Sequence, residues 1–269
     1  MNTCLKRLES VIETIGPLAV AVSGGVDSMT LAVVAHRVLG RKARMLHATS
    51  PAVPQEASRR VLAYANREGW RLDVIDAREF ADSNYVENPH NRCFYCKSNL
   101  YLTMTDMVDC VLASGTNRDD LSDYRPGLQA AAVYGVRHPY VEAEMGKEGV
   151  RAVAREMSLH DLAALPASPC LSSRVETGIS IDPKVLDAIH HAERLVQREL
   201  VPETARCRVR HDTVVVELDA ESIRGLDTAR ANALRQRIGV LLSAAGVNHP
   251  VSFQTYRMGS AFLRPGREG

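Results

Sequence analysis

The chain has 269 residues, of which 45% are hydrophobic and 24% are charged. This length and composition suit one large globular domain or two smaller ones, and they exclude collagen-like, low-complexity and disordered chains. The 33 basic and 32 acidic side chains leave a net charge of +1, so we expect neither nucleic acid nor a membrane surface as a partner. The apolar stretches are shorter than the roughly 18 residues of a membrane span. Because the stretch from Met1 to Glu13 also lacks a signal-peptide pattern, we expect a cytoplasmic protein.

Short apolar runs alternate with helical patterns over residues 1–165. The alternation predicts an α/β domain, a parallel sheet with helices on both faces, in which ligands bind beyond the carboxyl ends of the strands. The predicted strands are Leu18–Val22, Arg44–Thr49, Arg71–Ala77, Val108–Ala113 and His138–Val141. The predicted helices are Ser28–Leu39, Gln55–Gly69, Cys96–Asp106, Gly127–Tyr134 and Gly146–Met157.

Residues 166–269 follow a different pattern, which predicts a smaller α+β domain for substrate binding and oligomerisation. A Pro- and Ser-rich loop opens this region, and Asp182 and Pro183 then supply the cap and first position of a helix. The later predicted elements are strands at Arg206–Arg210, Thr213–Leu218 and Pro250–Tyr256 and a long helix at Thr228–Ala245.

A glycine-rich turn, Ser23-Gly24-Gly25-Val26-Asp27-Ser28, connects the first predicted strand to a helix. The glycines permit a tight turn, and the N–H groups at a helix start attract anions. The turn lacks both the Walker ending and G-x-G-x-x-G. It matches the S-G-G-x-D-S signature of the PP-loop ATP pyrophosphatases, which resemble each other in cleaving ATP to AMP and pyrophosphate. We expect Ser23, Gly24, Gly25, Asp27 and Ser28 to bind ATP; the alternative is a Ser/Gly turn without a ligand.

A second polar turn, from Gly115 to Asp120, follows the fourth predicted strand at the same edge of the sheet. Its two adjacent carboxylates suit Mg²⁺ held against phosphates. We therefore expect Gly115, Asn117 and Asp120 to bind the cofactor. The alternative is a polar turn in which an aspartate caps a helix.

The C-x-x-C pair, Cys93 and Cys96, places two sulfurs close enough to share one metal or cluster. The neighbouring Arg92 and Lys97 favour thiolates. Alternatives are a redox pair or direct sulfur chemistry, a zinc site completed by His90, or ordinary cysteines.

A third cysteine, Cys170, lies in the Pro- and Ser-rich loop. Three thiolates suit an iron–sulfur cube with one open iron, whereas Cys4, Cys110 and Cys207 are interpreted as structural. Beside an ATP-cleaving loop, such cysteines indicate sulfur transfer: adenylation makes an oxygen a leaving group, and a thiolate or sulfide then attacks the carbon.

These motifs together resemble the LarE family, ATP-dependent sulfur transferases of the PP-loop class. The resemblance extends through Asn88-Pro89, Arg92–Lys97, Gly115–Gly127, Pro169–Arg174, Arg208–Arg210 and Tyr256–Ser260. It implies adenylation of a carboxylate of pyridinium-3,5-biscarboxylic acid mononucleotide and its conversion to a thiocarboxylate, in the synthesis of the nickel-pincer nucleotide cofactor.

Two branches of this family obtain sulfur differently. In one, the cysteine that corresponds to Cys170 gives up its own sulfur. In the other, that cysteine and a C-x-x-C pair bind a [4Fe-4S] cluster, whose open iron carries sulfide. The presence of Cys93 and Cys96 indicates the cluster branch, with Cys170, Asp27 and Lys97 as catalytic residues, ATP and Mg²⁺ as further cofactors, and sulfide or another sulfur donor as a partner. The resemblance also implies a homo-oligomer.

The smaller domain holds the expected substrate-binding residues. Arg206, Arg208 and Arg210 alternate along one strand, so their guanidiniums are expected to reach a substrate phosphate together, the alternative being a solvated strand face. Glu217 is expected beside them as a partner or magnesium ligand. Ser173 and Arg174 follow Cys170 closely enough to touch the substrate.

Two other functions are compatible with these motifs. One is [4Fe-4S]-dependent thiolation of a tRNA base, against which the near-neutral charge and the lack of a zinc ribbon or long basic extension argue. The other is a nucleotide-binding iron–sulfur sensor without turnover.

Overall fold

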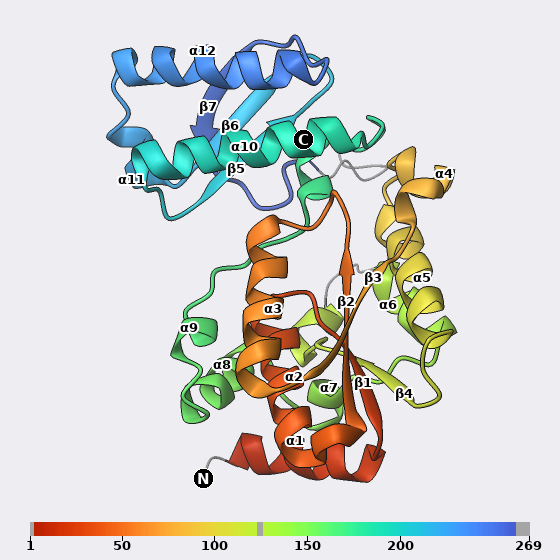
Figure 1. Cartoon of the computed structure of the whole chain (residues 1–269). Coiled ribbons are helices and arrows are strands. Elements are labelled where there is room, and N and C mark those ends of the chain that lie inside the picture. The colour runs from red at the N-terminus through yellow and green to blue at the C-terminus, as the bar shows by residue number, and fades with distance from the viewer. Residues whose placement is uncertain (1–2, 123–125, 262–269) are drawn as a thin grey trace. The chain divides into compact units, whose positions relative to one another are not determined.

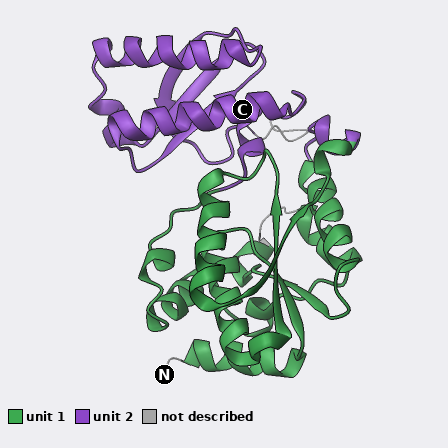
Figure 2. Ribbon diagram, in the orientation of Figure 1, with its two compact units in different colours: residues 1–82, 91–168 green, residues 83–90, 169–269 purple. Residues whose placement is uncertain are grey.

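The computed structural model describes residues 3–122 and 126–261. The chain forms two compact units, unit 1 of residues 1–82 and 91–168 and unit 2 of residues 83–90 and 169–269 (Figure 2). Among the described helices, none combines the length and the apolar character needed to cross a bilayer. The predicted fold class is confirmed, because a parallel sheet flanked by helices is accompanied by a smaller mixed sheet in the C-terminal region (Figure 1).

Unit 1 is built on four parallel strands in the order β3-β2-β1-β4. They are β1 (Leu18–Ala21), β2 (Ala43–Thr49), β3 (Arg71–Asp76) and β4 (Val111–Ser114). In the register of the sheet, Ala21 of β1 is level with Ser114 of β4. The turns that follow these two strands therefore leave the sheet side by side.

Both faces of this sheet are covered, which explains why β1 is a continuous apolar run. Leu18 and Val20 face one hydrophobic cluster and Ala19 faces the other. The first cluster includes residues of α1 (Thr3–Ile15), α2 (Val26–Leu39), α3 (Gln55–Glu68), α7 (Pro139–Glu142), α8 (Lys147–Glu156) and α9 (His160–Ala163). The second includes residues of α5 (Arg92–Thr105) and α6 (Pro126–Val133).

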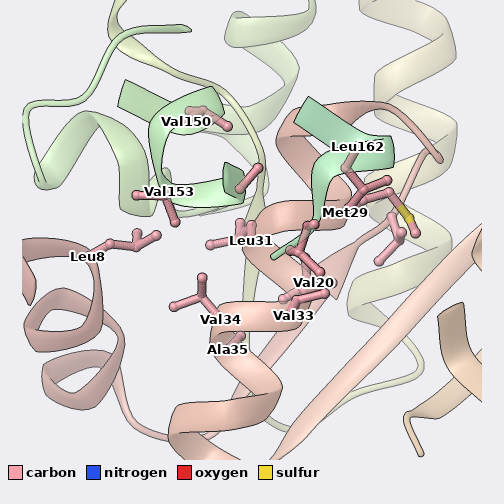
Figure 3. Packing of buried hydrophobic residues seen from close by; sticks show 14 of the residues in the cluster. Leu8, Val20, Met29, Leu31, Val33, Val34, Ala35, Val150, Val153 and Leu162 are labelled. Carbon is pink, nitrogen blue, oxygen red and sulfur yellow. The ribbon is translucent and has the colours of Figure 1, made fainter. Parts of the chain in front are cut away.

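Helix α2 lies in the middle of the first cluster (Figure 3). It packs against the sheet and also against α1, α8 and α9. Its buried side chains therefore lie on nearly every side of the helix, including Met29, Leu31, Val33 and Val34. This packing fixes the start of α2, where the glycine-rich turn ends.

The predicted strand at His138–Val141 is wrong. Residues Pro139–Glu142 form one helical turn, α7, and Arg137 alone pairs with Ala113 of the sheet. Proline has no N–H for a strand ladder, and its fixed φ suits the first position of a helix. The helix predicted at Cys96–Asp106 also begins earlier, at Arg92, so the C-x-x-C pair lies at the amino-terminal end of α5.

Unit 2 contains a three-stranded sheet in the order β5-β6-β7, with β5 antiparallel and β7 parallel to β6. The strands are β5 (Ala205–Val209), β6 (Val214–Leu218) and β7 (Val251–Thr255). Its helices are α4 (Ser83–Val86), α10 (Pro183–Leu200), α11 (Ala220–Arg224) and α12 (Thr228–Ala244). As predicted, Asp182 caps α10, and its side chain accepts the N–H of Lys184 at 2.7 Å.

Residues 83–90 belong to unit 2 although they precede α5 in the chain. Asn88 is fully buried with a left-handed φ of 54°, and its Nδ2 donates to the carbonyls of Glu176 and Ile179, both at 2.8 Å. Nearby, the hydroxyls of Tyr85 and Ser172 are 2.6 Å apart. Hydrogen bonds to distant backbone thus hold this segment in unit 2.

We predict that Asn88→Ala lowers the free energy of unfolding by about 2–3 kcal/mol, because two partly buried carbonyls lose their donor and alanine is strained at positive φ. Urea denaturation of the full chain measures the change. Asn248→Ala, at an exposed position, is the control and is expected to be neutral. Equal stability of the two variants would contradict the role of Asn88.

Candidate functional site

The glycine-rich turn after β1 is held closed by its own serines. The Oγ of Ser28 accepts the N–H of Ser23 at 3.0 Å and lies 3.0 Å from the Oγ of Ser23. Gly24 has a φ of 83°, and a Cβ there would lie 2.7 Å from the carbonyl oxygen of Ala57. Gly25 is the N-cap residue of α2. The backbone N–H groups at the start of α2 are thereby presented beyond the end of the sheet, where they suit an anion.

The turn after β4 packs directly on the start of α2. A Cβ at Gly115 would lie 2.7 Å from the backbone nitrogen of Ser28, so only glycine permits this approach. The Oγ of Ser114 lies 3.0 Å from that of Thr116 and 2.9 Å from Nδ1 of His138. Burial lowers the pKa of His138, so its ring is neutral at pH 7.

Asp27 connects the two turns. Its Oδ1 accepts Nδ2 of the buried Asn117 at 3.3 Å, and its Oδ2 forms an ion pair with Lys147. The hydroxyl of Tyr140 donates to the carbonyl of Asp27 at 2.9 Å. Complete burial raises the pKa of Tyr140 well above its usual value, so this phenol stays protonated. In the second turn, Asp120 accepts the backbone N–H of Asn117 at 3.1 Å.

A pocket of about 270 Å³ opens where these turns meet. Six residues predicted as catalytic or cofactor-binding border it, namely Ser23, Asp27, Ser28, Lys97, Gly115 and Asp120. Ala21, Tyr101, Ser114, Thr116, Gly127 and Leu128 complete its lining. Gly24, Gly25 and Asn117 belong to the same two turns and shape them. The site-residue predictions for this edge of the sheet therefore converge on one pocket within unit 1.

The chemistry of this pocket suits phosphate groups. Backbone N–H groups, serine hydroxyls and the ammonium of Lys97 are donors, and the dipole of α2 adds positive potential. Asp27 and Asp120 supply carboxylate oxygens. Over residues 3–122 and 126–261, no group of three or more His, Cys, Asp or Glu side chains is arranged to hold a metal ion. A magnesium ion here would therefore take further ligands from phosphate oxygens and water, as is usual for Mg²⁺.

The predicted cysteines lie in both units. Cys93 and Cys96 are three residues apart on α5, so both half-buried side chains lie on one face of the helix. Cys170 is exposed in unit 2 and is the N-cap residue of a 3₁₀ turn, Leu171–Arg174. Cys207 is completely buried, and burial raises the pKa of its thiol, which fits its structural interpretation.

Arg174 organises the backbone around Cys170. Its buried guanidinium forms a two-point ion pair with Glu193, at 2.9 and 3.1 Å. Its Nη1 donates to the carbonyls of Pro169 and Cys170 at 2.6 and 3.0 Å. The hydroxyl of Ser173 donates to the same Cys170 carbonyl at 2.7 Å. Both predicted residues therefore contact the cysteine loop.

The arginines of β5 are not a solvated strand face. Arg208 is 4% exposed and Glu217 is 1% exposed, and their side chains pair at 2.9 Å. Arg208 also donates to the carbonyl of Ser173 at 3.0 Å, and Arg210 lies 3.5 Å from Glu217. Burial, and then the positive charge of Arg174, lower the pKa of Arg206. Glu217 thus lies beside Arg208 and Arg210 as their partner.

Sequence reasoning missed several residues of these two sites. Lys147 and Tyr140 contact Asp27, and Glu193 holds Arg174. His47 at the end of β2 bonds to the Val22 carbonyl at 2.8 Å through Nδ1. Each is a single residue far along the chain from its partner, without a motif of its own.

The fold and the pocket define an α/β protein with a glycine-rich turn and a polar pocket at the carboxyl edge of a parallel sheet. No family model matches the chain. An uncharacterized protein of Synechocystis is 36% identical over 225 residues, which cover 81% of this chain and 83% of that protein. The chain therefore belongs to the same family as the Synechocystis protein.

Two further relatives align with most of the chain. An uncharacterized protein of Methanocaldococcus jannaschii is 24% identical over 206 residues, or 75% of this chain and 77% of that protein. A protein of Lactiplantibacillus plantarum is 28% identical over 216 residues, or 78% of each chain, and is named pyridinium-3,5-bisthiocarboxylic acid mononucleotide synthase.

We predict that Gly24→Ala destabilises the protein by about 1–3 kcal/mol more than Gly16→Ala does. Both glycines have a positive φ, of 83° and 80°, but a Cβ at Gly16 would meet nothing within 4 Å. The pair separates the cost of the contact with Ala57 from the cost of the backbone conformation. Urea denaturation measures both; equal losses would show that the turn does not approach α3 closely.

Proposed function

We propose that the protein is an ATP-dependent sulfurtransferase of nickel-pincer nucleotide cofactor biosynthesis. It would adenylate a carboxylate of pyridinium-3,5-biscarboxylic acid mononucleotide and convert it to a thiocarboxylate. One observation carries the proposal: a glycine-rich turn borders a polar pocket in a chain 28% identical to pyridinium-3,5-bisthiocarboxylic acid mononucleotide synthase. This homologue supports a LarE-type sulfurtransferase at the level of the family.

In the proposed first step, a carboxylate oxygen of the substrate attacks the α-phosphorus of ATP, and pyrophosphate leaves. The N–H groups at the start of α2, the hydroxyls of Ser23 and Ser28, and the ammonium of Lys97 would stabilise phosphate oxygens, and the three side chains border the pocket. Asp27 and Asp120 would hold Mg²⁺ against the phosphates, together with phosphate and water ligands. The product is an acyl adenylate, in which AMP is the leaving group.

In the second step, a sulfur nucleophile attacks the activated carbon and AMP leaves. We propose that Cys93, Cys96 and Cys170 are the three thiolate ligands of a [4Fe-4S] cluster. The common helix face of Cys93 and Cys96 fits ligation by this pair. When bound, such a cluster would supply sulfide at its open iron, with sulfide or another donor replenishing it.

Unit 2 would bind the pyridinium nucleotide. The proposed direct contacts are the half-buried Arg206 and Arg210, and the buried Ser173, Arg174 and Arg208 would hold the backbone around them. Glu217 would keep Arg208 and Arg210 oriented, since it lies against both. A guanidinium that is already positioned by a carboxylate loses little entropy when it binds a phosphate.

We predict that the purified protein releases pyrophosphate from ATP only when the pyridinium nucleotide is present. Asp27→Ala should reduce this rate at least about 100-fold, because a carboxylate that would hold Mg²⁺ against the reacting phosphates is removed, while iron content stays unchanged. Asp212→Ala, in the exposed turn after β5, is the control. Release that depends on tRNA instead would favour the thiolation of a tRNA base, and ATP binding without cleavage would favour a sensor.

We predict that Cys93→Ala and Cys96→Ala each abolish both the cluster absorbance and multiple turnover after anaerobic reconstitution with iron and sulfide. Cys110→Ala, which changes another half-buried cysteine of unit 1, should retain both. Full turnover by either variant of the pair would remove the cluster from the reaction. Loss of the mass of one H₂S from Cys170 after turnover would instead identify the cysteine as the sulfur source.

A further inference from the structure

Lys147 joins three parts of unit 1. It is the first residue of α8, and its backbone N–H donates to Oδ2 of Asp119 at 2.7 Å. Its ammonium forms the ion pair with Oδ2 of Asp27. The N-cap residue Gly146 is part of this junction, because a Cβ there would lie 2.7 Å from Oδ1 of Asp119. Lys147 thereby connects α8 to the turn after β4 and to the start of α2.

Asp27 is held at both carboxylate oxygens. Asn117 donates to Oδ1 and Lys147 to Oδ2, while Tyr140 fixes the backbone carbonyl. Asp27 borders the pocket, whereas Lys147 reaches the pocket only through Asp27. Asp119 and Asp120 add two negative charges on the neighbouring turn. The ammonium of Lys147 therefore offsets part of a local excess of carboxylates.

We propose that Lys147 is a positioning residue that keeps Asp27 oriented and charge-compensated until metal-bound nucleotide arrives. The inference rests on the proposed function, in which Asp27 serves a magnesium polyphosphate. A divalent cation that uses Oδ2 of Asp27 must compete with the ammonium for that oxygen. A metal-free polyphosphate, in contrast, is attracted by the same ammonium. Lys147 therefore weakens the binding of a free divalent cation and strengthens the binding of a metal-free polyphosphate.

The experiment compares Lys147→Gln with wild type in two binding measurements that need no turnover. We expect binding of Mn²⁺ alone, followed by electron paramagnetic resonance, to become about fivefold tighter, because the competing charge is gone. We expect binding of metal-free pyrophosphate, followed by calorimetry, to become about fivefold weaker. Lys147→Arg, which retains the charge, should restore values near wild type.

The matched control is Lys184→Gln. Lys184 also lies in the first turn of a helix with its backbone N–H bonded to an aspartate at 2.7 Å, but its side chain is exposed. It should alter neither measurement. In an Asp27→Asn background, Lys147→Gln should no longer change Mn²⁺ binding, because Lys147 acts there through Asp27. Thermal denaturation of every variant confirms folding.

The proposal would be overturned if Lys147→Gln changed the affinities for Mn²⁺ and pyrophosphate in the same direction or changed neither. It would also be overturned if the wild-type protein bound neither probe. A Mn²⁺ effect that persists in the Asp27→Asn background would overturn it as well. A failure of the proposed function gives a different result: the opposite shifts in binding remain, but ATP is not cleaved in the presence of the pyridinium nucleotide.

Discussion

The close approach of two backbone segments, at Gly115 and at the start of α2, is the constraint on which the pocket depends. The register of β1 against β4 brings the two turns to the same level, and the absence of a side chain at Gly115 lets the second turn contact Ser28. At this separation, Nδ2 of Asn117 donates to Oδ1 of Asp27 at 3.3 Å. The position of the pocket therefore depends on the register of the sheet and on the lack of a Cβ at Gly115. The backbone fixes where the two turns lie, and the polar side chains then line the space between them.

Buried or partly buried charge pairs perform a similar task in each unit. In unit 1, Lys147 holds Asp27, and in unit 2, Glu193 and Glu217 hold Arg174 and Arg208. The desolvation of such pairs offsets much of their attraction, so they contribute little to net stability. In unit 2, the guanidinium of Arg174 donates to the backbone carbonyl of Cys170, and that of Arg208 donates to the carbonyl of Ser173. These pairs therefore serve to orient the side chain of Asp27 in unit 1 and the backbone around Cys170 and Ser173 in unit 2.

Sequence patterns predicted the elements whose formation depends on local or periodic signals. The strands β1, β2 and β3 and the cap at Asp182 were predicted correctly because apolar runs and N-caps act over a few residues, and the same holds for the positions of the two polar turns after β1 and β4. The assignment of His138–Val141 failed because an apolar run of that length suits a strand or a helix, and Pro139 decided between them. The place of residues 83–90 in unit 2, and the pairing of Lys147 with Asp27, arise from contacts between distant positions. Periodicity carries no information about such contacts.

Helix α5 carries predicted site residues of two kinds, the cysteine pair and Lys97. Lys97 borders the pocket from this helix, and Cys93 lies four residues earlier, one turn away on the same face. Gly127 of α6 keeps that face closely packed, because a Cβ there would lie 3.0 Å from Cγ of Lys97 and 3.7 Å from the carbonyl oxygen of Cys93. The rise of an α-helix is about 1.5 Å per residue, so the Cα atoms of Cys93 and Lys97 are about 6 Å apart along its axis. A helix fixed in this way holds Cys93 and Lys97 as parts of one rigid body, so a shift of α5 that moved one of them would also move the other.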